Sequence, residues 1–232
     1  MAAMKLIRAM LLGGSALVAQ ACVPVVTPEQ VFSQASRSVV MVYAAETSGK
    51  IVGRGSGVFV GRDLLVTNCH VIGRGKVFLV GHRQKRSRAR LVGYDADKDL
   101  CVLNAQGLDV TPARIGDASA VQVGQRVYAI GAPEGFELTL SEGLVSGLRE
   151  AATGQYIQTT APMSEGSSGG GLFDDRGRLI GITSFVFSAG QNLNFAAPAE
   201  WAAELAKKVS GTTVEIGLPP SLAKQWRHPL LK

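Results

Sequence analysis

The chain has 232 residues, of which 46% are hydrophobic and 18% are charged. That length and composition are enough for a real hydrophobic core and too little for several large domains. The formal net charge is +6, or about +4 once Lys5 and Arg8 in the first 21 residues are subtracted. Proteins of every class carry a surplus of this size, so it does not predict nucleic acid as a partner.

The first 21 residues have the features of a signal peptide. Lys5 and Arg8 precede an apolar stretch over residues 10–19, and Ala19-Gln20-Ala21 matches the small-residue pattern of a cleavage site. A membrane-spanning helix needs about 20 apolar residues, so this stretch is too short to span a bilayer comfortably. We expect residues 1–21 to be removed on export; the alternative is an amphipathic segment that stays as the start of the fold.

Cys22 follows the expected cleavage site directly. Bacterial lipoproteins carry a cysteine at the same point, usually after Leu-x-Gly or Leu-x-Ala, whereas this chain has Ala19 in place of the leucine. Cys22 is therefore a candidate for lipidation, with a freely soluble exported form as the alternative. Both hypotheses place the mature protein outside the cytoplasm, in the bacterial periplasm, and the first adds attachment to a membrane through Cys22.

The segment 22–37 is expected to contain a short helix, because Thr27-Pro28-Glu29-Gln30 combines a capping box with a proline at the first helical position. From residue 39 onward, short aliphatic stretches alternate with glycine-containing breaks, which is typical of strands. The first set of stretches covers residues 39–43, 55–60, 64–67, 77–80, 89–93 and 100–103. After a polar connection near 104–125, the second set covers residues 127–130, 138–145, 156–159, 179–185 and 191–195.

Two sets of five or six strands, similar in length, predict two β-barrels or two sandwiches, which we place at residues 38–112 and 113–210. The second unit returns to a helical pattern over 198–209, where Ala202, Leu205 and Ala206 recur at helical spacing. Gly211 is expected to end this helix. Residues 211–232 form a tail to which the sequence assigns no role.

A strongly basic stretch lies in the first unit. Residues 74–90 contain seven lysines or arginines and no acid. A solvated basic hairpin is one interpretation, and docking to an anionic surface or partner is the other.

Two features of the sequence concern chemistry. His70, one of three histidines with His82 and His228, stands where the apolar stretch 64–67 ends. Taken alone, it is more typical of a buried structural residue. The stretch 166–171 places Ser167 and Ser168 among four glycines, between apolar strands where a flexible linker is rare.

Glycines of this kind let successive N–H groups point at one spot. Acyl transfer needs such donors because negative charge develops on the carbonyl oxygen. A serine nucleophile also needs a base and a carboxylate that orients the base. The stretch 166–171 therefore indicates a hydrolytic site, provided that a histidine and an acid join it.

Three segments resemble, in the right order, the signature segments of the trypsin-like superfamily: residues 67–71 (TNCHV), 97–103 (DKDLCVL) and 166–170 (GSSGG). The pieces between them resemble the HtrA/Deg-type branch of bacterial proteases, at residues 129–135, 143–146, 157–161, 179–182 and 194–198. The similarity extends over roughly residues 36–205. Members of that branch usually carry a PDZ domain as well, which we do not expect in this chain.

The resemblance implies an all-β fold of two six-stranded antiparallel barrels of chymotrypsin type, with a short N-terminal helix, a C-terminal helix packed outside and the active site between the barrels. It implies Ser168 as nucleophile, His70 as general base and Asp99 as the orienting carboxylate, with Asp97 as a rival outside the family pattern. The N–H groups of Gly166 and Ser168 would form the oxyanion hole. The implied activity is that of a serine endopeptidase acting on proteins or peptides, without metal or cofactor.

The chain departs from the family pattern around the nucleophile. Ser167 and Gly171 replace the usual asparagine and proline, which are mild changes. Pro162 stands six residues before Ser168, where trypsin carries the aspartate that selects basic residues. We therefore expect a substrate pocket formed by Pro162, Ser184 and Phe195 that prefers small or medium apolar residues to lysine and arginine.

Cys69 and Cys101 adjoin the implied base and the implied aspartate. If Asp99 reaches His70, the two backbones run close together, so the cysteines are candidates for a disulfide in an exported protein. The alternative is two small buried thiols that fill the core. Zinc is not expected, since neither CxxC nor HxxxH spacing occurs.

Two other functions remain as alternatives. A catalytically silent module could grip extended peptides by β-addition without cutting them, but the intact His70, Asp99, Ser168 and Gly166 count against it. An esterase or acyltransferase could use the same three residues, and ester and peptide substrates would separate it from a protease.

Overall fold

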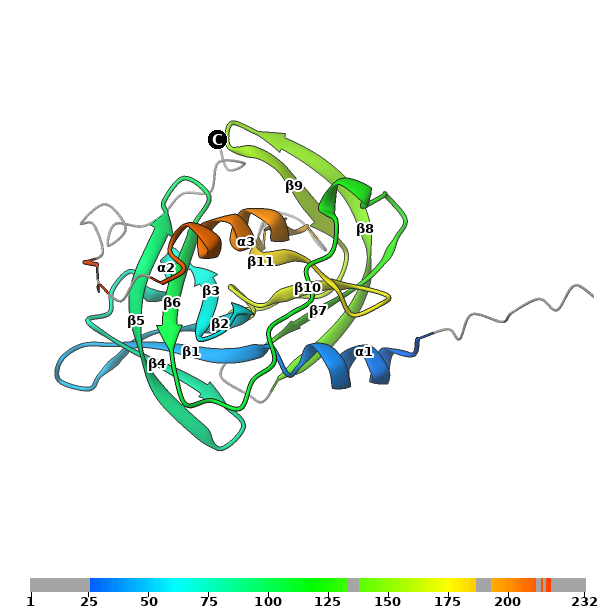
Figure 1. Cartoon of the computed structure of the whole chain (residues 1–232). Coiled ribbons are helices and arrows are strands. Elements are labelled where there is room, and N and C mark those ends of the chain that lie inside the picture. Colours follow the sequence, from blue (N-terminus) through cyan, green and yellow to red (C-terminus); the bar gives the residue numbers. More distant parts are fainter. Residues whose placement is uncertain (1–25, 133–137, 187–192, 212–213, 215, 218–232) are drawn as a thin grey trace, which may run out of the picture.

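The computed structural model describes residues 26–132, 138–186, 193–211, 214, 216 and 217. In this part of the chain, twelve strands close into two six-stranded antiparallel barrels, which confirms the predicted fold class. Figure 1 shows the barrels side by side, the first in blue to green and the second in green to orange. The predicted signal peptide, Cys22 and most of the tail lie outside the described residues.

The first barrel has the strand order β1-β2-β3-β6-β5-β4. Its strands are β1 (Val39–Ala45), β2 (Ile51–Gly61), β3 (Leu64–Asn68), β4 (Val77–His82), β5 (Lys85–Asp95) and β6 (Leu100–Ala105). Each contains one predicted stretch. Side chains alternate along a strand, so β1 directs Val40, Val42 and Ala44 into the barrel, where all three are fully buried.

The second barrel has the strand order β10-β11-β12-β9-β8-β7. Its strands are β7 (Arg126–Gly131), β8 (Thr139–Ala151), β9 (Gly154–Thr159), β10 (Gly171–Asp174), β11 (Leu179–Val186) and β12 (Asn194–Pro198). The sequence did not predict β10, because it has four residues and begins inside the glycine stretch. Pairing with β7 and β11 compensates for its length, since both neighbours hold it in the sheet.

The described residues contain few helices. The predicted N-terminal helix is confirmed as α1 (Pro28–Ala35), with both hydrogen bonds of its capping box present. The others are α2 (Cys69–Ile72), the 3₁₀ turn η1 (Ala118–Ala120) and the predicted C-terminal helix α3 (Ala199–Lys208). The described ranges contain three α-helices, α1, α2 and α3, and none of them is long and apolar enough to cross a membrane.

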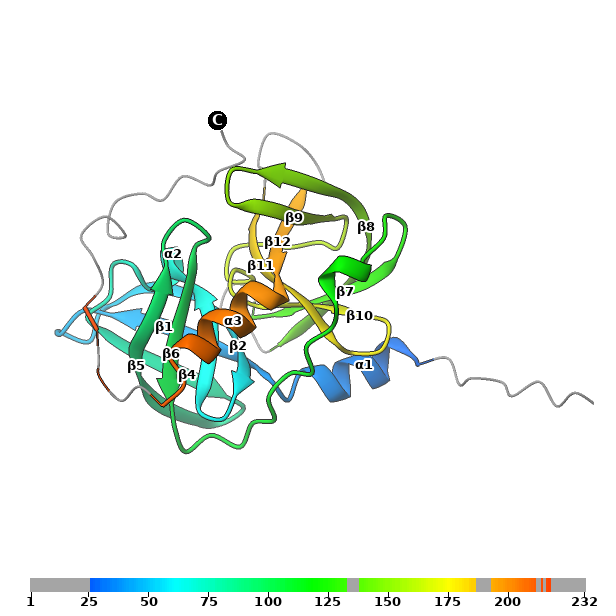
Figure 2. The same ribbon diagram turned by 45° about the horizontal axis from the view of Figure 1, so that its top comes forward.

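Helix α3 crosses the seam between the barrels, as Figure 1 and Figure 2 both show. It contacts β2, β3, β5 and β6 of the first barrel and β11 and β12 of the second. Its buried alanines share one apolar cluster with Val39 and Val58 of the first barrel and Tyr128 and Phe173 of the second. The seam is therefore a third hydrophobic core, distinct from the two barrel interiors, and it fixes the barrels against each other.

The basic stretch 74–90 forms the predicted hairpin, made by β4 and β5. Arg86, Arg88 and Arg90 alternate with the buried Ala89 and Leu91, so the three guanidinium groups lie on the outside of the barrel. The guanidinium carbon of Arg86 lies 5.7 Å from the centre of the Tyr43 ring. Docking to an anionic partner remains a prediction.

His82 ends β4 inside the first barrel, with 5% of its surface exposed. Its Nδ1 lies 3.2 Å from the carbonyl oxygen of Val39, and Nε2 has no hydrogen-bond partner among the described residues. Burial lowers the pKa of His82, because the charged imidazolium loses its hydration. The Val39 carbonyl and Asp109 oppose this shift, and Arg83 adds to it.

A lowered folded-state pKa means that the unfolded chain binds more protons, so stability should fall as the pH drops below about 6.5, the ordinary histidine value. We expect this decline, measured by urea unfolding at pH 8 and pH 5, to be smaller in His82→Gln than in the wild-type protein. The two proteins share every other titrating group, so their difference isolates His82. Equal declines would contradict the assignment.

Candidate active site

His70 is held at the junction between strand β3 and the one-turn helix α2. Strand β3 is buried along its whole length and ends at Asn68, whose backbone is still extended where α2 begins. Cys69, Val71 and Ile72 point into the first barrel. The remaining side chain of the turn, His70, faces the seam with 34% of its surface exposed.

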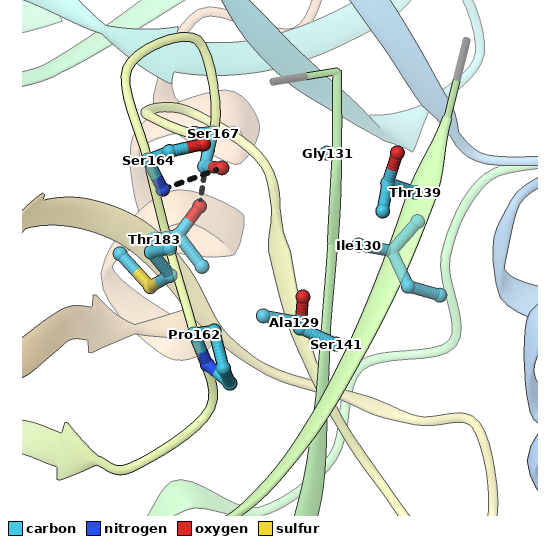
Figure 3. Close-up of a pocket in the computed structure, with 10 residues that line it drawn as sticks. Ala129, Ile130, Gly131, Thr139, Ser141, Pro162, Ser164, Ser167 and Thr183 are labelled. Atoms are coloured by element: carbon cyan, nitrogen blue, oxygen red, sulfur yellow. Dashed lines mark hydrogen bonds between the residues drawn. The ribbon is translucent and has the colours of Figure 1, made fainter. Parts of the chain in front are cut away.

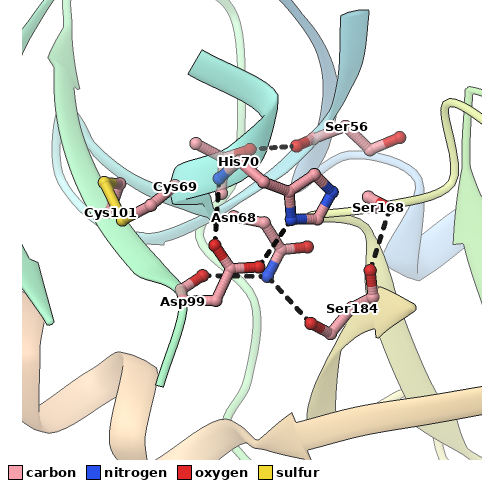
Figure 4. Close-up of polar contacts among 9 residues, drawn as sticks. Ser56, Asn68, Cys69, His70, Asp99, Cys101, Ser168 and Ser184 are labelled. Atoms are coloured by element: carbon pink, nitrogen blue, oxygen red, sulfur yellow. Dashed lines mark hydrogen bonds and ion pairs between the residues drawn. A yellow bond between two sulfur atoms is a disulfide. The ribbon is translucent and has the colours of Figure 1, made fainter. Parts of the chain in front are cut away.

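Asp99 lies directly beneath the imidazole, in the turn between β5 and β6. Its side chain is fully buried, and its two carboxylate oxygens accept from the backbone N–H of His70 at 2.9 Å and contact Nδ1 at 2.6 Å. An imidazole that donates from Nδ1 carries its lone pair on Nε2, which can accept a proton. Figure 4 shows the ring of His70 between Asp99 and Ser168.

The backbone of Asp99 is unusual and firmly held. Its φ is +56°, a left-handed conformation that aspartate tolerates better than most residues. Its carbonyl oxygen accepts from the N–H of Cys69 at 3.1 Å and from Nδ2 of Asn68 at 3.0 Å. These bonds aim the carboxylate at His70. Asp97, the rival carboxylate, is exposed on the outside of the same turn.

Ser168 comes from the second barrel, in the loop between β9 and β10. Its hydroxyl donates to the carbonyl oxygen of Ser184 at 2.9 Å, and its own carbonyl oxygen accepts from the N–H of Ser56 in β2 at 2.8 Å. Gly169 has a φ of +84°, and a Cβ there would lie 2.2 Å from the carbonyl oxygen of Ser56. Only glycine therefore lets the loop approach the first barrel this closely.

One of the two proposed oxyanion donors, the N–H of Gly166, lies in a tight turn over residues 164–167, just before Ser168. The N–H of Ser167 donates to the carbonyl oxygen of Ser164 at 3.0 Å, and Gly166 has a φ of +92°. A positive φ at the third residue is the mark of a type II turn, which is why glycine occupies this position. The central peptide of such a turn carries the N–H of Gly166, and a type I turn would point it the opposite way.

The predicted substrate-binding residues do not all line one described cavity. A cavity of about 200 Å³ lies beside the loop that carries Ser168 and is lined by Pro162, Met163, Ser164, Ser167, Thr183 and residues of β7 and β8. Figure 3 shows Thr183 and Ser167 on one side and Ile130 with Thr139 on the other. Ser184 and Phe195 are 1% and 7% exposed and are not part of this lining. Their role in substrate binding remains a prediction.

Two polar residues of the site were absent from the sequence-based assignment. Ser56 links β2 to the loop that carries Ser168, and Nδ2 of Asn68 lies 3.4 Å from Oγ of Ser184 across the seam. Asn68 belongs to the signature segment 67–71 and lies close to His70 in the sequence, and this position was the signal that could have identified it. Ser56 stands between Gly55 and Gly57, and small residues in a strand mark a close backbone approach.

A disulfide joins Cys69 and Cys101, the two cysteines considered as a pair, with their Cα atoms 5.0 Å apart. It ties α2, which carries His70, to β6, which follows Asp99. In the described ranges, no group of three or more histidine, cysteine, aspartate or glutamate side chains could hold a metal ion.

Removing this bridge should lower both stability and activity. The closed loop spans a sequence separation of 32, for which the chain-entropy model gives about 3–4 kcal/mol. We expect the double variant Cys69→Ala/Cys101→Ala to lose about that much free energy of unfolding in denaturant titrations. Two free thiols in non-reducing mass spectrometry of the wild-type protein, isolated from its native compartment, would contradict the bridge.

The fold and the geometry together define a class. Two antiparallel barrels that meet at a buried aspartate, a histidine and a serine, in this chain order, are the architecture of trypsin-like serine hydrolases. A family model described as the trypsin-like peptidase domain matches residues 55–182, just over half of the chain. The chain therefore belongs to the trypsin-like peptidase family.

The chain is also similar in sequence to several named proteins. The chain is 34% identical over 176 residues to the anti-sigma-I factor RsgI9 of Acetivibrio thermocellus, covering 75% of this chain and 25% of that protein. It is 38% identical over 183 residues to the chloroplastic Protease Do-like 5 of Arabidopsis thaliana, covering 67% and 56%. A probable periplasmic serine endoprotease of Pseudomonas savastanoi, described as DegP-like, is 32% identical and is covered to 35%.

Solved structures agree with the sequence relatives. The crystal structure of a serine endoprotease from Yersinia pestis superposes with a TM-score of 0.71 at 30% identity, covering 78% of this chain and 65% of that one. The HtrA-type protease AlgW with a tripeptide gives 0.70 at 30% identity, covering 78% and 62%. The predicted HtrA-type resemblance is confirmed. The chain spans between a quarter and just over half of the curated relatives described above.

Proposed function

We propose that this chain is an exported serine endopeptidase that hydrolyses peptide bonds through an acyl-enzyme. The observation that carries the proposal is the buried Asp99 carboxylate, which contacts Nδ1 of His70 at 2.6 Å beside a serine on a glycine-shaped loop. A buried carboxylate in this position keeps the imidazole in one tautomer and stabilises it once it is protonated.

The first half of the reaction forms the acyl-enzyme. The O–H of Ser168 turns from the Ser184 carbonyl to Nε2 of His70, which takes the proton while Oγ attacks the substrate carbonyl carbon. The resulting oxyanion is stabilised by the N–H groups of Gly166 and Ser168. His70 then protonates the leaving amine as the C–N bond breaks.

The second half releases the product. Water enters the place of the amine, His70 removes one of its protons, and the hydroxide oxygen attacks the acyl carbon. The same two N–H groups stabilise the second oxyanion. When the ester bond to Ser168 breaks, His70 returns the proton to Oγ, so the three side chains end in their starting states.

Substitutions in the triad test this proposal. Ser168→Ala should lower the rate of peptide hydrolysis by about 10⁶, as for other triad serines, and Asp99→Asn by about 10⁴ through the wrong imidazole tautomer. Asp97→Asn is the matched control and should cost little, because Asp97 is exposed. The measurements are cleavage of a casein substrate and labelling with a fluorophosphonate probe.

Cleavage by Ser168→Ala at the wild-type rate would reject the assignment. A wild-type protein that binds peptides but neither cleaves them nor reacts with the fluorophosphonate would instead support the silent peptide-binding module. Hydrolysis of esters without hydrolysis of peptides would support the esterase.

The substrate pocket is proposed to involve Pro162, Ser184 and Phe195, none of which carries a charge. We expect small or medium apolar residues before the cleaved bond, since no aspartate stands at position 162 to pair with lysine or arginine. Proteomic cleavage profiling, with the Ser168→Ala protein as background, measures this preference. A profile dominated by lysine or arginine at that position would contradict it.

The site of action is proposed from the chain's N-terminus and from its relatives. The DegP-like relatives are named as periplasmic, and residues 1–21 have the features of a signal peptide. We propose an exported, periplasmic protein that meets protein or peptide substrates there. The intact mass of the mature protein distinguishes a lipidated Cys22 from a soluble form, because acyl chains add a defined mass.

A further inference from the structure

Ser56 of β2 is a fully buried polar residue at the point where the first barrel contacts the loop that carries Ser168. Its backbone N–H donates to the carbonyl oxygen of Ser168 at 2.8 Å, and its carbonyl oxygen accepts from Oγ1 of Thr67 at 2.7 Å. Figure 4 shows Ser56 on the same side of the site as Ser168. The backbone of Ser56 is therefore fixed on both sides, and its side chain has a defined direction.

The hydroxyl of Ser56 makes two further hydrogen bonds, both to the second barrel. It donates to the carbonyl oxygen of Gly166 at 2.7 Å and accepts from the N–H of Ala132, after β7, at 2.8 Å. A hydroxyl has a single proton to donate. Because the contact with Ala132 needs a lone pair, the proton of Ser56 is committed to Gly166.

The contact with Gly166 holds one peptide plane of the turn over residues 164–167. The plane between Gly166 and Ser167 is fixed at its carbonyl end by Ser56 and at its N–H end by the carbonyl oxygen of Ser164, 3.0 Å away. Peptide planes are rigid, so only the two backbone dihedrals of Gly166 connect this plane to the preceding one. The preceding plane carries the Gly166 N–H, one of the two proposed oxyanion donors.

Without the hydroxyl, the Gly166–Ser167 plane loses its contact with the first barrel and keeps only the bond to Ser164 within the same turn. Gly166 has wide backbone freedom, so the turn can then shift relative to β2 and Ser168. Such a shift would move the Gly166 N–H away from the oxyanion.

We propose that Ser56 is the positioning residue of the oxyanion hole, which acts through Gly166 and touches neither substrate nor the reacting atoms. The inference rests on the proposed function, because it assumes that Gly166 donates to a reaction intermediate. In a purely structural role, Ser56 would only join the two barrels. The positioning role differs from this in one respect. A positioning residue affects stabilisation of the transition state while substrate binding and the Asp99–His70 pair stay intact.

The test compares Ser56→Ala with a matched control, Ser38→Ala. Ser38 is a serine of the same burial, 1% exposed, whose hydroxyl donates to the carbonyl oxygen of Ala35, away from the site. Deleting one oxyanion donor outright costs about 10² to 10³ in rate. A misdirected donor should cost somewhat less, so we expect kcat to fall about 10- to 100-fold in Ser56→Ala on a cleaved peptide, with KM changed less than threefold.

Two further measurements separate positioning from structure. Phosphonylation of Ser168 by the fluorophosphonate should slow in parallel with kcat, since the phosphoryl oxygen needs the same donors. The acid limb of the pH profile of kcat/KM should stay where it is in the wild-type protein, since Asp99 and His70 are untouched. Ser38→Ala should match the wild-type protein in all of these, whatever it does to thermal stability.

A second variant covers the case in which Ser56→Ala does not fold. Ser56→Cys keeps the side-chain size and a weak donor, so it should retain more activity than Ser56→Ala and less than the wild-type protein. Wild-type kcat in either folded variant would overturn the inference, as would a loss in which KM, kcat and the acid limb all move together. If Ser168→Ala also retains activity, the proposed function fails; if Ser168→Ala is inactive and Ser56→Ala is fully active, only the role of Ser56 fails.

Discussion

The proposed catalytic residues come from two separate barrels, so the seam between the barrels must be held in one arrangement. An apolar cluster that includes residues of α1, α3 and strands of both barrels packs the barrels against each other. The nonspecific attraction of such a core does not by itself set positions to the accuracy that catalysis needs. Directional hydrogen bonds across the seam supply that accuracy, and two of them, both from Ser56, reach the loop that carries Ser168.

Burial of a carboxylate at this seam is unfavourable unless its oxygens are satisfied. Asp99 meets that condition through the N–H and the imidazole of one residue, His70, which makes the pair a single unit. The disulfide beside it restrains the same two segments covalently. The stability of the first barrel and the direction of the imidazole therefore depend on the same few contacts.

Much of this architecture was predictable from local patterns. Eleven of the twelve described strands contain or overlap a predicted aliphatic stretch, and the capping box at Thr27 predicted α1. The exception, β10, is short and starts with Gly171, so its pairing with β7 and β11 had no local signal. Residues 85–88 at the start of β5 lay outside the predicted aliphatic stretches, because arginines alternate with small residues there, and only the hairpin interpretation of 74–90 included them.

By itself, the sequence determined an all-β chain of two units from its short aliphatic stretches. The resemblance of its signature segments determined the family, the two-barrel fold and the residues proposed to carry the chemistry, because each segment is a pattern of a few neighbouring residues. The tertiary structure decided which atoms meet. Ser56 and Gly166 are 110 residues apart and Asn68 and Ser184 are 116 apart, and each pair joins the two barrels. Contacts of that kind depend on how one closed barrel packs against another, and no local pattern encodes that geometry.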